Sequence, residues 1–249
     1  MSFPNIVFGS EGELWHNSAT ETVPVGTLMI IEDGRSFRFC EIAASVTTVV
    51  GGLLQAEVHT TDQSGEAVGT LDAGVTRLTG VGSTSSGLTL NEYVNGYAYT
   101  DNAVTLPMMR IRANSAITAG DSDGTIDLYI KTPTAIASGN TLCYIKNPWR
   151  DVILKPASAE TAPAIGINKV VITADQFGWV QTSGPASALY DASTTAIATI
   201  GDPIAPDQAV ASAISGIADS TTDTVIIIGN ALGVVEGDTN QTPVFLRME

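Results

Sequence analysis

The chain has 249 residues, a formal net charge of −15 and a charged fraction of only 15%. This length suffices for one large all-β domain or two smaller ones with a buried core. The negative charge disfavours direct binding of nucleic acid or of an anionic membrane, because both need clustered Lys and Arg. No stretch approaches the roughly 18 apolar residues of a membrane span, and the opening MSFPNIVFGSEGE lacks the pattern of a secretory signal. We therefore expect a chain made in the cytoplasm, without a membrane partner.

Residues 1–24 are predicted to form an extended N-terminal arm. Its apolar side chains are separated by Pro, Gly and Asn, which disfavours a helix. A strand from such an arm can add to the sheet edge of a neighbouring protein. It can equally be the terminal strand of the chain's own sheet. The arm residues that we expect at an interface are Phe3, Ile6, Phe8 and Trp15.

A β-hairpin is predicted next, from two β-rich runs at 27–31 and 36–41. The connecting Glu32-Asp33-Gly34 suits a type I′ turn. The following segment, 45–60, is rich in β-branched residues, which favours a strand broken at Gly51-Gly52 over a short helix.

The middle of the chain is rich in Gly, Ser and Thr, with strands predicted near 75–78 and 88–90. The segment NEYVNGYAYTDNA at 91–103 carries Tyr93, Tyr97 and Tyr99. These tyrosines either form a recognition patch or are strand residues with a wet hydroxyl end.

An acidic turn, GDSDGTID, precedes an alternating strand. Asp121, Asp123 and Asp127 surround a glycine, as oxygen ligands for calcium do, but no twelve-residue loop closes on a Glu. We interpret the segment as a turn, with metal binding left open. In the following TIDLYI, the alternation predicts that Ile126, Leu128 and Ile130 share one buried face.

The third part is the most regular. Within QFGWVQTSGPA, at 176–186, a strand at 177–182 would place Phe177 and Trp179 on one face and Gly178 on the other. The Ser-Gly-Pro that follows is predicted to be a turn. Short strands with turn signals recur along the whole chain, without heptads or repeats. The fold class is therefore all-β, a β-sandwich or barrel, with a β-rich domain at 25–160 and a barrel-like domain at 161–249.

No motif predicts catalysis. The two histidines, His16 and His59, have no recognisable nucleophile motif beside them, and no phosphate-binding loop is present. Cys40 and Cys143 have apolar neighbours and are expected to be buried, reduced thiols. We expect no enzyme, no cofactor and no metal-dependent chemistry.

Four segments carry a resemblance to a known group of proteins. VGTLMIIEDGRSFRFCEIA at 25–43, NPWRDVIL at 147–154, QFGWVQTSGPA at 176–186 and IIIGNALGVVEGDTNQTPVFLRM at 226–248 resemble, in this order, landmarks of tailed-bacteriophage virion structural proteins. The last segment is similar to the closing segment of head decoration (cement) proteins. The resemblance does not cover about 60–110.

The resemblance implies a β-tulip-like, non-enzymatic protein on the outer capsid surface of a virion. It implies a homotrimer that contacts the major capsid protein and bridges capsid subunits. Alternatives are a tail or head-fibre component, or a carbohydrate-binding β module whose aromatic side chains stack on sugar; a secreted hydrolase is a more distant one. Besides the arm residues, the candidate interface residues are Tyr93, Tyr97 and Trp149.

Overall fold

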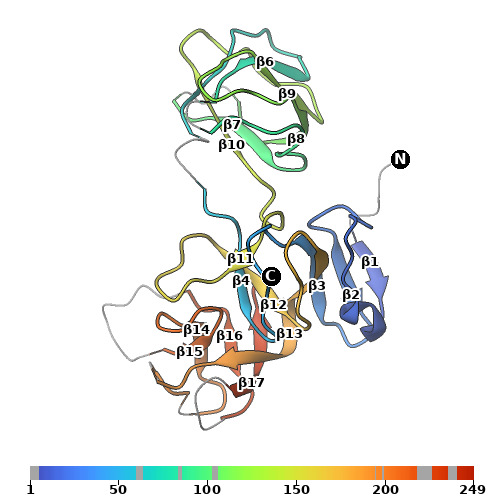
Figure 1. Cartoon of the computed structure of the whole chain (residues 1–249), viewed down its shortest axis with the longest axis vertical. Coiled ribbons are helices and arrows are strands. Elements are labelled where there is room, and N and C mark those ends of the chain that lie inside the picture. Colours follow the sequence, from blue (N-terminus) through green and yellow to red (C-terminus); the bar gives the residue numbers. More distant parts are fainter. Residues whose placement is uncertain are drawn as a thin grey trace. The chain divides into compact units, whose positions relative to one another are not determined.

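The computed structural model describes residues 6–59, 64–83, 86–102, 106–193, 195–197, 199–217, 226–234 and 240–249, and Figure 1 shows the chain. About 41% of the residues are in strands and 2% are helical, which confirms the all-β prediction. The chain divides into two compact units. Unit 1 comprises residues 1–57 and 148–249, and unit 2 comprises residues 58–147.

This division differs from the expected boundary at residue 160. The reason is strand pairing across the chain: β4 (Leu53–Gln55) pairs with β11 (Ile153–Leu154) and with β12 (Ala164–Asn168). Residues on both sides of 58–147 therefore share one sheet, and unit 2 is an insertion between them.

Unit 1 begins with an edge strand and a short 3₁₀ helix, followed by a hairpin. These elements are β1 (Ile6–Gly9), η1 (Glu11–Trp15), β2 (Leu28–Ile31) and β3 (Ser36–Glu41). The hairpin prediction is confirmed, but the type I′ turn is not. Only Gly34 of the loop has a positive φ, 85°, while a type I′ turn needs two such residues. Its amide donates to the carbonyl of Ile31 at 2.9 Å, as in a three-residue loop with a type I turn.

The longest strand, β13 (Phe177–Tyr190), corrects the prediction of a turn at Ser-Gly-Pro. Its first half pairs with β3, and from Ser183 onward it pairs with β17 (Asn240–Arg247). The register against β3 shifts between Gln181 and Ser183, and Gly184 has a φ of 88°. The turn-like residues therefore bend the strand as a β-bulge does and redirect it to a new neighbour, without reversing the chain.

A closed five-stranded barrel forms the C-terminal part of unit 1. Its remaining strands are β14 (Pro203–Pro206), β15 (Ile214–Gly216) and β16 (Gly229–Ala231), and the pairing of β13 with β17 closes it. The prediction of a barrel is confirmed. Leu53 and Ile167 pack into the same core as the barrel residues, so the barrel shares its interior with the strands before it.

The prediction for the two aromatic residues of β13 is confirmed. Phe177 and Trp179 pack around Phe39, whose ring centroid lies 5.8 Å and 5.0 Å from theirs. Gly178 faces the other way, where an added Cβ would lie 2.6 Å from Ile172 Cδ1. Cys40 is buried and free, as predicted.

Unit 2 contains a curled six-stranded sheet in the order β5-β10-β7-β8-β9-β6. The strands are β5 (Glu66–Ala67), β6 (Arg77–Val81), β7 (Tyr97–Thr100), β8 (Met109–Asn114), β9 (Gly124–Leu128) and β10 (Thr141–Ile145). The amide of Gly82 donates to the carbonyl of Ala67 at 2.9 Å, which draws the two ends of the sheet together. The buried inner face carries Leu78, Ile111, Ile126, Leu128 and Tyr144.

Two predictions for this unit are corrected. Ile130 is 66% exposed because β9 ends at Leu128, so the buried face stops there. The expected strand at 88–90 is reduced to a single bridge between Leu88 and Ile117. Within the described residues, no helix is long and apolar enough to cross a membrane.

Candidate functional site: an exposed apolar edge of unit 1

Strand β1 is the outermost strand of the large sheet of unit 1. It pairs in parallel with β2, from Ile6 opposite Leu28 to Gly9 opposite Ile31. Along the described residues, no strand pairs with its other side. The outward backbone groups of an edge strand are a template for pairing with another chain.

The side chains of β1 alternate between core and solvent. Ile6 is 47% and Phe8 85% exposed, whereas Val7 packs on the small core of Met29, Ile31 and Phe37. A Cβ at Gly9 would lie 2.2 Å from Met29 Sδ, so a larger residue here would require the Met29 side chain to move. The strand is thus held by its inner face while its outer face presents two large apolar side chains.

The 3₁₀ helix η1 adds a third exposed apolar side chain. Leu14 is buried in the same core as Val7, and the next residue, Trp15, is 62% exposed. The Ser10 amide donates to Glu13 Oε2 at 2.7 Å and fixes the start of the helix. Residues 6–15 of the expected arm therefore pack on the chain's own sheet and still expose apolar surface.

Carboxylates surround this edge. Glu11, Glu13, Glu32 and Asp33 are exposed, and Arg35 is the cation that pairs with Glu11 and with Asp33, the latter at 2.6 Å. The pKa of Asp33 lies below its usual range because the Arg35 amide and then its guanidinium donate to it, against an opposing effect of burial. The rim of the edge is therefore negatively charged at neutral pH.

The other predicted interface residues do not join this edge. Phe3 lies outside the described residues. Tyr93 lies in the core of unit 2, only 2% exposed, with its ring 4.9 Å from that of Tyr144, which corrects its placement at an interface. Tyr97 is half-buried on β7 of unit 2, and Trp149 is half-buried in unit 1 beneath the Arg38 guanidinium, 5.0 Å from the ring centroid.

The candidate metal ligands also separate. The carboxylate of Asp127 accepts two hydrogen bonds from Arg77, whereas Asp121 and Asp123 are exposed in the preceding turn. No group of three or more His, Cys, Asp or Glu side chains in the described parts of the chain is placed to hold a metal ion. His16 and His59 are exposed and belong to different units.

Sequence reasoning missed one arrangement. Arg77, Arg112 and Asp127 meet on the outer face of unit 2, although 35 residues separate the two arginines along the chain. Only the register of β6, β8 and β9 brings them together, and nothing local in the sequence signals it. No protein-family model, curated protein or solved structure matches this chain.

Proposed function

We propose that this chain is a non-enzymatic structural protein of a tailed-phage virion, which binds the outer capsid surface and bridges capsid subunits. The observation that carries the proposal is the β1 edge, a strand with no strand partner on its outer side within the described residues, which exposes Ile6 and Phe8 beside Trp15. The four segments that resemble virion structural proteins supply the biological setting.

Such an edge suits binding by strand addition. Main-chain hydrogen bonds to an added strand contribute affinity, and alternate side chains select the partner. Removing the Phe8 side chain from water would contribute on the order of 1.5–3 kcal/mol. An edge that is rigidly held by Val7 and Leu14 loses little conformational entropy when it binds.

The acidic rim selects the chemistry of the partner. A second copy of this edge would bring the carboxylates of Glu11, Glu13 and Glu32 against their equivalents, which repel. A capsid protein with basic residues beside an exposed strand would complement them. We therefore assign β1 to the major capsid protein, and any trimer contact to another surface.

Cosedimentation with capsids tests this assignment. Heads of the virus that encodes the chain are prepared without it and mixed with the purified protein. Wild type should bind, and Phe8→Asp should reduce binding at least tenfold, because it places a charge in the apolar contact. Ile200→Asp is the matched control, since Ile200 is another exposed apolar residue of unit 1, with an exposed fraction of 66%.

Equal binding by wild type and Phe8→Asp would remove β1 from the interface. Binding to tails or fibres in place of heads would favour that alternative location.

Light scattering after gel filtration, over a dilution series, then tests the homotrimer: a mass near three times 25.8 kDa supports it, and a monomer that remains monomeric on the capsid contradicts it.

A further inference from the structure

The outer face of the sheet in unit 2 is rich in arginine and tyrosine. Along β8, alternation buries Met109 and Ile111 and leaves the residues between and beside them exposed. Tyr, Arg and Met are enriched where proteins meet, whereas Lys, Glu and Asp are depleted. The composition of this face therefore indicates an interaction surface. We call it the arginine–tyrosine face; its residues are Tyr97, Tyr99, Met108, Arg110, Arg112 and Tyr129.

The arginine–tyrosine face carries more positive than negative charge. Arg112 and the adjoining Arg77 share one carboxylate, that of Asp127. Arg110 is exposed, and it forms no ion pair with a carboxylate in the described part of the chain. Its Nη2 donates instead to the amide oxygen of Asn95, at 2.8 Å. An acidic partner can therefore neutralise the charge of Arg110.

Arg110 is held in place before any partner binds. Asn95 is 7% exposed, and its Oδ1 accepts from Arg110 and, at 3.0 Å, from the Tyr129 hydroxyl. The guanidinium carbon of Arg110 lies 5.0 Å from the centroid of the Tyr129 ring, and Tyr97 lies opposite Arg110 in the register of β7 and β8. A fixed arginine between two tyrosines loses little entropy on binding, and these residue types often dominate the energy of an interface.

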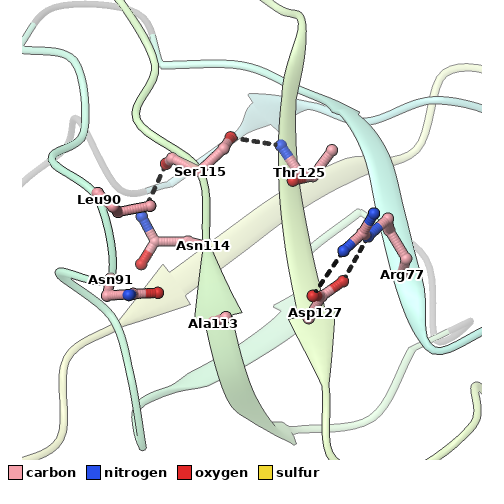
Figure 2. A pocket seen from close by; sticks show the side chains of 8 residues that line it. All are labelled: Arg77, Leu90, Asn91, Ala113, Asn114, Ser115, Thr125 and Asp127. Carbon is pink, nitrogen blue, oxygen red and sulfur yellow. Dashed lines mark hydrogen bonds and ion pairs between the residues drawn. The ribbon is translucent and has the colours of Figure 1, made fainter.

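A recess of about 240 Å³ adjoins this face, and Figure 2 shows its walls. Arg77, Asp127 and Thr125 lie along one side, and Leu90 and Asn91 along the other. Arg77 and Asp127 neutralise each other through two hydrogen bonds, and Leu90 is 69% exposed. The recess therefore suits an uncharged side chain of a partner, as pockets at the centre of interfaces do.

The negative charge of the chain is concentrated in unit 1. Unit 2 holds five of the 11 Lys and Arg but only eight of the 26 Asp and Glu, so its formal charge is −3 and that of unit 1 is −12. Two arginine–tyrosine faces would repel each other, whereas unit 1 of a second copy offers acidic surface. Charge complementarity thus favours a contact between unit 2 of one copy and unit 1 of another.

Unit 1 contains an acidic cluster apart from the rim of β1. Arg150 pairs with Glu41 at 2.7 Å and with Glu21 at 3.2 Å, and the exposed Asp175 is close enough for its charge to act on Glu41. The pKa of Glu41 lies above its usual range because of burial, and the charges of Asp151, Glu21 and Asp175 add to this while Arg150 opposes it. The charges around Glu41 are therefore more negative than positive.

We propose that the arginine–tyrosine face of one copy binds the acidic cluster of Glu21, Glu41 and Asp175 on a second copy. Because the two surfaces differ, the contact is heterologous, and each end of a dimer keeps one free surface. A closed ring of three copies would give the proposed homotrimer. The inference rests on that proposed self-association and names its surfaces, while capsid binding by β1 is separate from it.

Light scattering after gel filtration, over a dilution series of the full chain, tests both surfaces. Wild type should associate. Arg110→Ala and Asp175→Lys should each weaken association at least tenfold, because the first removes the cation of the face and the second opposes it with a like charge. An equimolar mixture of the two variants should form a 1:1 dimer and nothing larger, because each variant keeps one intact surface.

Arg247→Ala and Glu32→Lys are the matched controls. Arg247 is exposed in unit 1 and lies 5.7 Å from the ring centroid of Phe245, much as Arg110 lies over Tyr129, and Glu32 is exposed at the rim of β1. Both variants should associate as wild type does. Thermal unfolding of each variant separates loss of the contact from loss of the fold.

Three results would each overturn the proposal: a monomeric wild type at every concentration, unchanged association of Arg110→Ala, or a mixture of the two variants that stays monomeric. Phe8→Asp should keep the mass of wild type, and Arg110→Ala should still reach the capsid through β1. Self-association and capsid binding can therefore fail separately.

Discussion

The two units expose opposite kinds of surface. Unit 1 presents apolar side chains on an edge strand whose outer side pairs with no other described strand, beside an acidic rim, and unit 2 presents two arginines that share Asp127. Burial of apolar surface is non-directional and depends little on moderate salt, whereas charge pairing at an exposed site weakens as salt rises. Within one all-β chain, the two surfaces should therefore respond differently to salt.

The units also differ in how their interiors are built. Unit 2 packs on one continuous core, while the core of unit 1 is divided into several clusters that β13 connects. Each unit contains one buried thiol, Cys40 in unit 1 and Cys143 in unit 2. Burial also raises the pKa of Cys40, which keeps it a protonated, unreactive thiol. The two cysteines can thus report on the two units separately.

Truncation of either core gives the largest expected effects. Phe37→Ala should destabilise unit 1 by about 3–5 kcal/mol, and Leu128→Ala should destabilise unit 2 by about 2–5 kcal/mol, because each side chain is fully buried and leaves a cavity. Pulsed thiol labelling over a urea gradient, read by mass spectrometry, measures both. Compared with wild type, Cys40 should become reactive at a lower urea concentration in Phe37→Ala, and Cys143 at a lower urea concentration in Leu128→Ala. Simultaneous exposure of both thiols in both variants would show that the units unfold together.

The bend in β13 gives an intermediate effect. Gly184→Ala must adopt a positive φ and place its Cβ 2.9 Å from Arg35 Cγ, so we expect a loss of about 1–3 kcal/mol in unit 1. Gly34→Ala is the control, since Gly34 has a similar φ of 85° and open space around it. Its cost should be about 1 kcal/mol. Thiol labelling of Cys40 over a urea gradient measures the stability loss of unit 1 in each variant. Equal losses would mean that the close approach to Arg35 does not constrain β13.

Gly184 also shows where sequence reasoning succeeded and where it failed. Alternation placed Phe177 and Trp179 on one face correctly, because that pattern is local. The Gly-Pro signal after it was also local and predicted a turn. Pairing with β17, some sixty residues later in the chain, instead extends β13 through these residues. The same limit explains the domain boundary and the Arg77–Asp127 cluster, since both depend on strand neighbours that spacing along the chain does not reveal.

Two lysines give the smallest effects, and these should have opposite signs. Lys155 of unit 1 is fully buried, and its Nζ has no hydrogen-bond partner among the described residues. In unit 2, Lys146 Nζ lies 3.3 Å from Glu92. Lys155→Met should therefore stabilise the chain by about 1 kcal/mol at neutral pH, because it removes a buried charge that nearby carboxylates only partly compensate. Lys146→Met should destabilise it by about 1 kcal/mol, because it removes the cation that pairs with Glu92.

The pH dependence decides whether charge is the cause at Lys155. Burial lowers its pKa from the ordinary 10.5, and the charges of Glu160 and Asp207 only partly oppose this. Below the lowered pKa the folded chain carries the full cost of the buried charge. As pH rises from there to 10.5, the folded lysine is neutral while the unfolded one still binds a proton, so wild-type stability rises relative to Lys155→Met. Urea unfolding of both proteins over this range should show their difference shrinking. A constant difference would mean that packing, and not charge, sets the effect of Lys155.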